Sequence, residues 1–368
     1  MNILENKNME AIGKAKQLGP DKTIALLKKM GLTGRGGACF LTGLKWEITK
    51  KSKSNERFLI CNADEGEPGT FKDKYILENN PANVIGGIII GSYCIGAKEA
   101  YIYLRGEYYY LKKNLEELIA AILRQIKSKL KIHIIEGAEA YICGDETAII
   151  SSIENKRGYP HFKPPYPPQK GLFGKPTVIN NVETLANVPL ALTKSNWKDD
   201  LRLFSISGDV SHPGVYELKL GTKLKEIAKL AKAKDPKAIY LGAAGGCIPY
   251  NPNFLLNSEN VCKEEAMMGS CSLIFVGKKR KIIDMAIIIS EFFNRESCGK
   301  CTPCREGNPH ILKMLNKIKS KKATRKDYEL LKKLANIIQD TSLCGLGQSC
   351  CNHLLTALDH FNQEFNAK

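Results

Sequence analysis

The sequence lacks any apolar stretch long enough to cross a membrane. The longest hydrophobic run, from Val84 to Ala97, is shorter than the roughly 20 residues that a spanning helix requires, and glycines interrupt it. The first residues, MNILENKNMEAIGK, carry acidic side chains and lack the apolar core of a signal peptide. We therefore expect a cytoplasmic protein without direct membrane insertion, in which the apolar run forms a buried helix.

The chain also lacks the features of a nucleic-acid-binding protein, although it is strongly basic. Lys and Arg number 55 against 38 Asp and Glu, for a formal charge of +17. The lysines are scattered along predicted helices, are not interleaved with aromatic residues, and belong to no known nucleic-acid-binding motif. We expect no nucleic-acid partner and a solvated, lysine-rich surface, with docking of acidic proteins as the lesser alternative.

Repeats and low-complexity linkers are absent, and the 368 residues leave room for two or three domains. Residues 1–200 begin with amphipathic helices and then alternate strands and helices, which predicts an α/β domain with a mostly parallel sheet. Residues 201–280 begin with a predicted β-hairpin and continue as a small α+β unit. Residues 281–368 are predicted to be helical.

The chain contains thirteen cysteines without a secretion signal, which favours metal or redox chemistry over structural disulfides. Three of them, Cys298, Cys301 and Cys304, recur every third residue in SCGKCTPCREG. A four-thiolate zinc site and a Cys301–Cys304 disulfide remain alternatives. The C-x2-C-x2-C spacing favours three ligands of a [4Fe–4S] cluster, with a fourth thiolate from elsewhere in the fold.

The fourth ligand is expected to be Cys344. It lies in LCGLG, where neighbouring glycines let the backbone approach a cluster closely. Cys350 and Cys351 are the fallback candidates.

Two segments carry candidate nucleotide-binding residues. GLTGRGGACF, residues 31–40, contains closely spaced glycines around Arg35, whose main-chain N–H groups can surround an anion, although an ordinary loop explains it equally well. CNADEGEPGTFKDK places Asn62, Asp64, Glu65 and Glu67 directly after a predicted strand, where α/β sheets bind ligands. Acidic side chains there accept hydrogen bonds from ribose or ribityl hydroxyls and repel a 2′-phosphate, favouring NADH over NADPH; a solvated acidic turn is the alternative.

Two further segments are weaker signals. In YICGDETAIISSIE, Asp145 and Glu146 begin a predicted helix, where acidic residues also serve as caps. In KPPYPPQKGLFGKPTVINNVET, rigid prolines can hold Tyr166 against a planar ring, and the amides of Asn180 and Asn181 can contact phosphate or ring heteroatoms.

Together, GRGGACFLTGLKW, CNADEGEPGTFKDKYILE, ICGDETA, GLFGKPTVINNVET and ESCGKCTPCREG resemble the FMN- and NADH-binding flavoprotein subunit of NADH dehydrogenase (respiratory complex I). That family includes related subunits of NAD-linked hydrogenases and formate dehydrogenases. The resemblance covers residues 10–360. It implies a Rossmann-like FMN-binding domain, a ubiquitin-like β-grasp domain and a C-terminal helical bundle with a [4Fe–4S] cluster.

The resemblance also implies residue roles. The flavin loop would comprise Gly34, Arg35, Gly36, Gly37 and Lys45, with Arg35 or Lys45 supplying positive charge near the flavin. The residues that would contact or frame FMN are Asn62, Asp64, Glu65, Gly66, Tyr141, Gly144, Asp145, Glu146, Asn180, Asn181 and Thr184. NADH would contact Phe40, Glu67, Lys163 and Tyr166. The cluster ligands would be Cys298, Cys301, Cys304 and Cys344.

The implied activity is hydride transfer from NADH to FMN, followed by single-electron transfer to the cluster and to partner subunits. No residue acts as a general acid or base; Glu65, Glu67 and Glu146 frame the transfer. Expected partners are a thioredoxin-like [2Fe–2S] subunit and a larger iron–sulfur subunit. The alternatives are a diaphorase subunit of a soluble hydrogenase, formate dehydrogenase or bifurcating complex, and a non-catalytic iron–sulfur electron carrier.

The sequence departs from the family pattern at five positions. Cys39 replaces a usual Gly, Leu41 a usual Pro, Asp145 a usual Glu, Tyr166 a usual Phe, and Ile48 a usual aromatic residue. The last change is expected to weaken adenine stacking and NADH affinity.

Overall fold

The computed structural model describes residues 1–365, which form two compact units. The first comprises residues 1–66 and 71–201, and the second comprises residues 67–70 and the chain from Arg202 onward. The predicted 201–280 and 281–368 domains both fall in the second unit, so their separation stays a prediction. Residues 366–368 of the last one lie outside the described residues.

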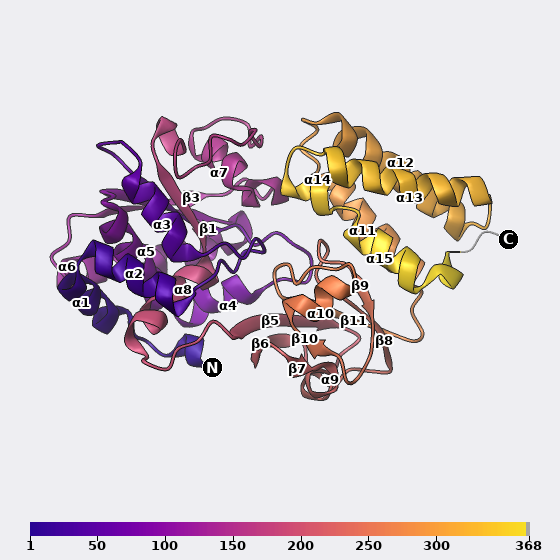
Figure 1. Cartoon of the computed structure of the whole chain (residues 1–368), viewed down its shortest axis with the longest axis horizontal. Helices are drawn as coiled ribbons and strands as arrows, with labels where there is room; N and C mark the ends of the chain where they lie inside the picture. The colour runs from indigo at the N-terminus through magenta and orange to yellow at the C-terminus, as the bar shows by residue number, and fades with distance from the viewer. Residues whose placement is uncertain (366–368) are drawn as a thin grey trace. The chain divides into compact units, whose positions relative to one another are not determined.

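The first unit contains a four-stranded parallel sheet, as the alternating sequence pattern predicted. The strand order is β3-β2-β1-β4; Figure 1 labels β1 and β3 of this sheet. The strands are β1 (Phe58–Ala63), β2 (Glu99–Leu104), β3 (Lys131–Glu136) and β4 (Thr177–Asn181). Because all four run in the same direction, their carboxyl ends meet at one edge of the sheet.

Helices pack around this sheet. They are α1 (Asn8–Leu18), α2 (Pro20–Met30), α3 (Thr42–Lys51), α4 (Lys72–Asn79), α5 (Pro81–Ile95), α6 (Lys112–Gln125), α7 (Glu146–Ile153) and α8 (Val182–Thr193), with short 3-10 turns η1 (Asn2–Leu4), η2 (Gly106–Leu111), η3 (Tyr141–Gly144) and η4 (Leu172–Gly174). The apolar run predicted as a buried helix is α5, nearly all of which is buried. Gly87 of α5 lies so close to α8 that an added Cβ would be 2.1 Å from the Leu185 carbonyl oxygen. The glycines of this run therefore permit close helix packing.

The second unit contains a five-stranded mixed sheet of order β6-β5-β11-β8-β9. The elements are β5 (Leu201–Gly208), β6 (Gly214–Lys219), β7 (Thr222–Lys223), α9 (Leu224–Ala231), β8 (Pro236–Tyr240), β9 (Cys247–Pro249), β10 (Leu255–Leu256), α10 (Ser258–Lys263) and β11 (Ser272–Gly277). The predicted hairpin is confirmed as far as β5 and β6 are sheet neighbours. One face of α9 packs into a core that includes Phe204, Ile227 and Phe275.

The remainder of the second unit is helical, as predicted. Its elements are α11 (Ile282–Glu296), α12 (Thr302–Lys319), α13 (Arg325–Thr341), α14 (Gly345–Ser349), α15 (Asn352–His360) and the short η5 (Asn362–Glu364). Helix α12 packs against α11 and α13, and α13 packs against α14. The cysteine-rich stretch connects α11 to α12.

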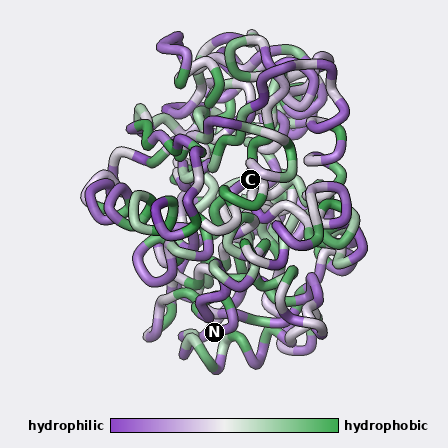
Figure 2. Tube along the Cα trace, turned by 90° about the vertical axis from the view of Figure 1, so that its left-hand side faces the viewer, coloured by the Kyte–Doolittle hydropathy of each residue, from purple (hydrophilic) through white to green (hydrophobic). Residues whose placement is uncertain are grey.

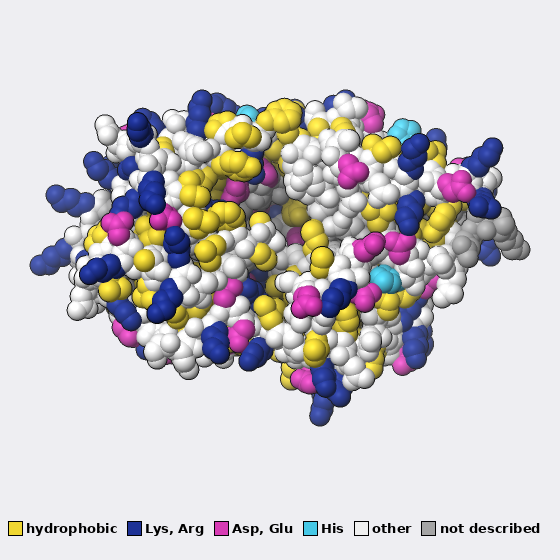
Figure 3. All heavy atoms as spheres, viewed as in Figure 1, with side chains coloured by type: hydrophobic (Ala, Val, Ile, Leu, Met, Phe, Trp, Pro, Cys, Tyr) yellow, Lys and Arg dark blue, Asp and Glu magenta, His cyan; other side chains and the backbone are white. Residues whose placement is uncertain are grey.

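Charged residues are distributed broadly over the surface. In Figure 3, Lys and Arg side chains are spread over the visible face and are interspersed with Asp and Glu. Figure 2 shows hydrophilic and hydrophobic residues mixed along most of the chain trace. Within residues 1–365, no helix combines the length and the apolar character that a membrane crossing would need.

Candidate functional site

The carboxyl ends of β1 and β4 bring three predicted site residues together. Asn62 and Asn181 are register partners on the two strands. The Asn62 amide donates to the Gly144 carbonyl at 3.0 Å, and its carbonyl accepts from the Asp64 backbone N–H at 3.0 Å. The Asn180 carbonyl accepts from the Trp46 indole N–H at 2.8 Å. Hydrogen bonds therefore orient these amides at the carboxyl edge of the sheet, the edge where α/β sheets generally bind ligands.

The glycine-rich loop closes on itself between α2 and α3. The Gly34 N–H donates to the Phe40 carbonyl at 2.8 Å, and Thr33 and Leu41 form an isolated antiparallel bridge. The Arg35 N–H donates to the Thr184 hydroxyl at 2.8 Å, which attaches the loop to α8. Gly36 and Gly37 follow this attachment and are exposed. Their main-chain groups are thus available to an anionic ligand.

The Arg35 side chain has a role that differs from the expected one. Its guanidinium is 1% exposed and pairs with Asp199 at 2.6 Å and with Glu183 at 3.6 Å. It also donates to the Leu201 carbonyl at 2.6 Å. Two carboxylates therefore neutralise the guanidinium, which fixes the loop to the unit. The positive charge expected near the flavin stays a prediction, for which Lys45 was the other candidate.

A buried charge network continues from Glu183 beneath the loop. The Lys72 ammonium, 1% exposed, pairs with Asp73 at 2.8 Å and with Glu183 at 3.0 Å. Asp73 also accepts from the Asn181 amide at 2.5 Å. Burial alone would lower the pKa of Lys72, but the carboxylates of Asp73, Glu183 and Glu65 raise it above its ordinary value. Lys72 is therefore charged and joins the glycine loop to the carboxyl end of β4.

Glu65 lies in the same network. Its carboxylate accepts from the backbone N–H groups of Asp73 at 2.9 Å and Lys74 at 3.0 Å, and from the Tyr108 hydroxyl at 3.2 Å. Burial, with the nearby Asp73 carboxylate, raises the pKa of Glu65 to about 7. The side chain of Asp64 is also fully buried and lies 3.4 Å from the Arg105 guanidinium. The acidic run is thus mostly built into the structure rather than being a solvated turn.

Two lysines supply positive charge near β4 and the start of α7. The Lys45 ammonium donates to Glu146 at 2.5 Å and to the Ile179 carbonyl at 3.1 Å. Lys163 lies 3.9 Å from Asp145 and 3.8 Å from Glu146. Asp145 is the N-cap of α7, where its side chain accepts from the Thr147 and Ala148 N–H groups. Its capping role is therefore established, and a cofactor contact remains a prediction.

The remaining predicted site residues differ in their exposure and in their protein neighbours. Phe40 and Tyr166, predicted to contact NADH, are 45% and 52% exposed. Tyr141 lies beside Gly66, where an added Cβ would be 3.4 Å from the tyrosine Cα. Glu67 belongs to the second unit, where its carboxylate accepts from the Ala244 N–H at 2.9 Å.

The donor set of the first unit fits a phosphate-bearing flavin. It combines exposed glycine main chain at Gly36 and Gly37, the Lys45 ammonium, and the amides of Asn180 and Asn181. Gly36 lies beside the end of β4, because an added Cβ would be 3.4 Å from the Asn181 Cβ. Such a set can hold the phosphate and the polar ring atoms of FMN.

The cysteine-rich stretch forms a turn at the start of α12, in the second unit. Cys301 is the N-cap of α12 and Cys304 lies in its first turn. The Cys304 thiol lies 3.2 Å from the Ser297 hydroxyl and 3.3 Å from the Asn308 amide. Hydrogen-bond donors and a helix N-terminus both stabilise thiolate sulfur and negative cluster charge.

Helix α14 brings the second cysteine segment to this turn. Cys344 is the N-cap of α14. Gly347 packs against Cys304, and an added Cβ there would lie 3.3 Å from the Cys304 Cβ. Gly347 thus permits close packing of α14 against Cys304, whereas Gly345 has open space around it, and close approach of this backbone to a cluster stays a prediction.

Several thiols gather at this point. Burial, with smaller contributions from the nearby thiols of Cys350, Cys301 and Cys298, raises the pKa of Cys304 to about 12. Cys350 and Cys351 are buried, with their sulfurs 3.7 Å apart. Within residues 1–365, no three or more His, Cys, Asp or Glu side chains are grouped closely enough to hold a metal ion. The thiols near the starts of α12 and α14 are donors of the type that binds an iron–sulfur cluster, and the individual ligands remain candidates.

Comparison with known proteins assigns the two regions. The family model described as the Nuo51 FMN-binding domain matches residues 27–190. The model described as the NADH-ubiquinone oxidoreductase-F iron–sulfur binding region matches residues 284–368. The F subunit of the NADH-quinone oxidoreductase of Aquifex aeolicus is 40% identical over 98% of this chain and 89% of its own length.

The chain belongs to the family of NADH-quinone oxidoreductase F subunits. It accordingly contains an FMN-binding domain and an iron–sulfur binding region, and the predicted resemblance is confirmed. The α subunit of the NAD-reducing hydrogenase HoxS from Cupriavidus necator is 38% identical over 95% of this chain. A crystal structure of an NAD⁺-reducing [NiFe]-hydrogenase in the air-oxidized state matches 94% of the chain with a TM-score of 0.87 and 37% identity. The chain spans 61% and 62% of these two hydrogenase chains, respectively.

Sequence reasoning missed the residues that support the glycine-rich loop of this family member. Lys72 and Asp73 lie within the motif CNADEGEPGTFKDK, and Glu183 lies within GLFGKPTVINNVET. Their pairing, however, depends on the fold. Asp199, near the end of the first unit, gave no local signal. A usable signal was the presence of Glu183 in the otherwise uncharged segment VETLANVPLAL, because a lone buried charge requires a partner.

Proposed function

We propose that this member of the F-subunit group oxidises NADH, with hydride passing to bound FMN and the electrons leaving singly through a [4Fe–4S] cluster. The observation that carries this proposal is the pairing of an FMN-binding domain with an iron–sulfur binding region in one chain, which is similar to the NADH-quinone oxidoreductase relative over nearly its whole length. A non-catalytic electron carrier would have no need of the intact edge of the flavin-binding sheet.

The proposed FMN contacts fall on the first unit. The exposed main-chain N–H groups of Gly36 and Gly37 would donate hydrogen bonds to the phosphate, and the Lys45 ammonium would neutralise its charge. Asn180 and Asn181 would orient the ligand. The Lys45 ammonium donates a hydrogen bond to Glu146, and this contact holds its position before any ligand binds. This preorganisation lowers the cost of ligand binding.

The proposed NADH contacts are Phe40, Glu67, Lys163 and Tyr166. The exposed rings of Phe40 and Tyr166 offer flat surfaces for stacking. Ile48, itself 38% exposed, offers only aliphatic contact where an aromatic residue would stack. We expect the NADH affinity of this chain to be correspondingly modest.

The cluster would be held by Cys298, Cys301, Cys304 and Cys344, with the first three arranged around the start of α12 and Cys344 at the start of α14. The five-stranded sheet with α9 supports assigning residues 201–280 to the expected β-grasp, and the helices from α11 onward support a cluster-holding bundle.

The proposed partners are a thioredoxin-like [2Fe–2S] subunit and a larger iron–sulfur subunit, in a complex located in the cytoplasm or at the cytoplasmic face of the membrane. Relatives include proteins named as subunits of NADH-quinone oxidoreductase and of NAD-reducing and NADP-reducing hydrogenases. The complex could therefore deliver electrons to quinone or serve as the diaphorase part of a soluble enzyme.

An anaerobic NADH titration tests the function. Protein purified with its partners is analysed for iron and flavin and then mixed with NADH while the absorption spectrum is followed. We expect the flavin absorbance to bleach at low NADH, followed by the signal of a reduced cluster. Colourless protein, zinc in place of iron, or a flavin that NADH does not bleach would each contradict the proposal.

A further inference from the structure

A cavity of about 550 Å³ lies in the first unit, outside the proposed cofactor site. It is bordered by α1, the end of α5, the loop after α6, and the starts of β2 and β3. Strands β2 and β3 begin at Glu99 and Lys131, so the cavity lies at the amino edge of the parallel sheet. The predicted flavin residues occupy the carboxyl edge. The cavity is therefore a separate feature of the fold.

The walls of the cavity are largely apolar. Ile12 and Ala15 come from α1, Ile89 and Ile90 from α5, and Leu130 from the loop before β3. Small-molecule sites in proteins usually have volumes of roughly 300–1,000 Å³ and mostly apolar walls with a few polar groups. The volume and lining of this cavity both fall in that class.

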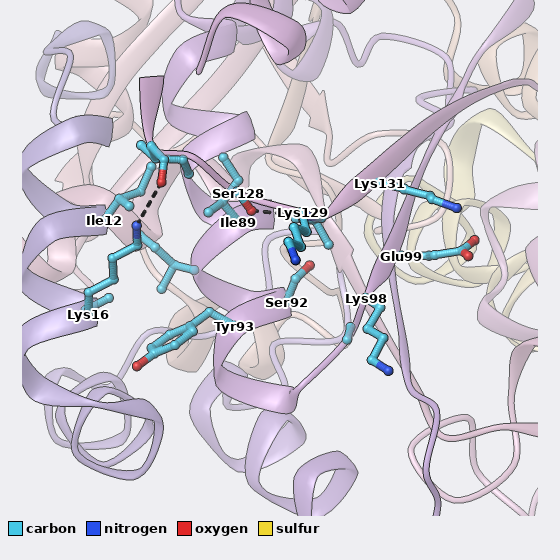
Figure 4. Close-up of a pocket in the computed structure, with 15 residues that line it drawn as sticks. Ile12, Lys16, Ile89, Ser92, Tyr93, Lys98, Glu99, Ser128, Lys129 and Lys131 are labelled. Atoms are coloured by element: carbon cyan, nitrogen blue, oxygen red, sulfur yellow. Dashed lines mark hydrogen bonds between the residues drawn. The ribbon is translucent and has the colours of Figure 1, made fainter. Parts of the chain in front are cut away.

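The charged groups around the cavity are mostly lysines. Lys16, Lys98, Lys129 and Lys131 line it, with Glu99 as the only acidic lining residue. Figure 4 shows them on different sides of the group: Lys16 on one side, Lys98 and Lys131 on the other, and Lys129 between. The Glu99 carboxylate is already bound by the Tyr101 hydroxyl at 3.2 Å and lies 3.1 Å from His133 Nε2.

The lysines differ in how far the protein satisfies them. Lys16 donates to the Ile126 carbonyl at 3.3 Å, as the dashed line in Figure 4 shows. Within residues 1–365, the ammonium groups of Lys98, Lys129 and Lys131 form no ion pair. Four lysines against the single carboxylate of Glu99 give the cavity lining a net positive charge.

A buried polar group faces the same cavity. Ser92 of α5 lines it and is 1% exposed. Its hydroxyl is buried and has no hydrogen-bond partner within the described chain. A buried hydroxyl without a partner is unfavourable, and an acceptor brought by a ligand would satisfy it. In Figure 4, Ser92 and Lys129 occupy the middle of the group of lining residues.

We propose that this cavity binds a small amphipathic anion, consisting of an aliphatic or aromatic body and one terminal carboxylate or phosphate. The isoleucine walls would receive the apolar body. Lys98 and Lys129 would neutralise the anionic group, and the Ser92 hydroxyl would donate to it. A nucleotide fits less well, because its sugar and base would place several polar groups against apolar walls.

Calorimetric titration of the FMN- and cluster-loaded protein tests this with octanoate and octyl phosphate as monomeric probes. We expect both to bind with 1:1 stoichiometry, and octanol and inorganic phosphate to bind at least tenfold more weakly. A double Lys98→Glu/Lys129→Glu variant should weaken octanoate binding at least tenfold. The control Lys14→Glu/Lys22→Glu has the same charge change on exposed lysines that do not line the cavity, and should bind within twofold of the wild type.

Ser92→Ala separates a ligand contact from a structural role. Because the hydroxyl has no partner in the described chain, the variant should be at least as stable as the wild type without ligand, yet should bind octanoate severalfold more weakly. A loss of stability with unchanged octanoate affinity would overturn the assignment of Ser92.

The same chemistry is also present at the surface of an anionic lipid bilayer. Phosphatidylglycerol vesicles are therefore sedimented with the wild type and with both double variants. Vesicle binding that depends on Lys98 and Lys129, without octanoate binding in solution, would overturn the small-molecule proposal in favour of a membrane contact. Absence of octanoate and octyl phosphate binding at millimolar concentration would overturn it outright.

Discussion

Lys72→Met is expected to destabilise the first unit severely. The variant keeps a long apolar side chain of similar reach but removes the ammonium, which is 1% exposed and pairs with Asp73 and Glu183 at 2.8 and 3.0 Å. Both carboxylates are themselves almost fully buried. Without the ammonium, Asp73 would lose its cation, and Glu183 would keep only the Arg35 guanidinium at 3.6 Å. Removing one partner of a buried ion pair typically costs about 3–5 kcal/mol of unfolding free energy.

This loss can be measured as a change in Tm. At about 2–4 °C per kcal/mol for a domain of this size, the variant should unfold about 6–20 °C below the wild type. Lys51→Met is the matched control, because Lys51 forms an exposed pair with Glu47 at 2.9 Å and its loss should leave Tm nearly unchanged. FMN content should also fall in Lys72→Met, because the network supports the loop through Arg35 and Asn181.

A double variant decides whether the uncompensated charge is the cause. Lys72→Met/Glu183→Gln should recover part of the lost unfolding free energy. The double variant lacks one of the two carboxylates that paired with Lys72, while Asp199 still pairs with Arg35. Equal Tm values for Lys72→Met and Lys51→Met, or simple addition of the losses from Lys72→Met and Glu183→Gln, would refute the reasoning.

Three further predictions concern Glu65, Glu67 and Cys301. Because the pKa of Glu65 is about 7 in the folded state against an ordinary value of 4.5, the folded state binds more protons, and its contribution to the unfolding free energy falls as the pH rises from about 4.5 to 7. Chemical denaturation of Glu65→Gln over this range should therefore show a flatter pH dependence than the wild type; parallel curves would contradict the raised pKa. Glu67→Gln keeps an oxygen for the Ala244 N–H but removes the charge, so kcat/KM for NADPH relative to NADH should rise about tenfold, equivalent to ~1.4 kcal/mol of repulsion, and an unchanged ratio would count against its role. Cys301→Ala should abolish the low-temperature EPR signal of the reduced cluster while FMN remains bound, and a full signal would show that Cys301 is not a ligand.

Much of the local structure could be predicted from the sequence because local patterns determine it. The apolar periodicity of α1 and α2, the strand runs of β1 to β3 and the buried run of α5 all appear where the pattern placed them. The long motifs likewise indicated the family, because their glycines, amides and cysteines are consecutive along the chain. Asp145 capping α7 was foreseeable for the same reason.

The charge network was decided only by the tertiary structure. Arg35 looked like a ligand-facing cation in the sequence, but Glu183 and Asp199, about 150 residues later in the chain, lie close enough to bury and neutralise it. Lys72 is an ordinary lysine in a charged segment until the packing of α4 against α8 removes it from water. Sequence patterns report which residues are neighbours along the chain and which face of an element is apolar. Partners that are distant in the chain, and therefore the electrostatic role of each charge, follow only from how the helices and strands pack.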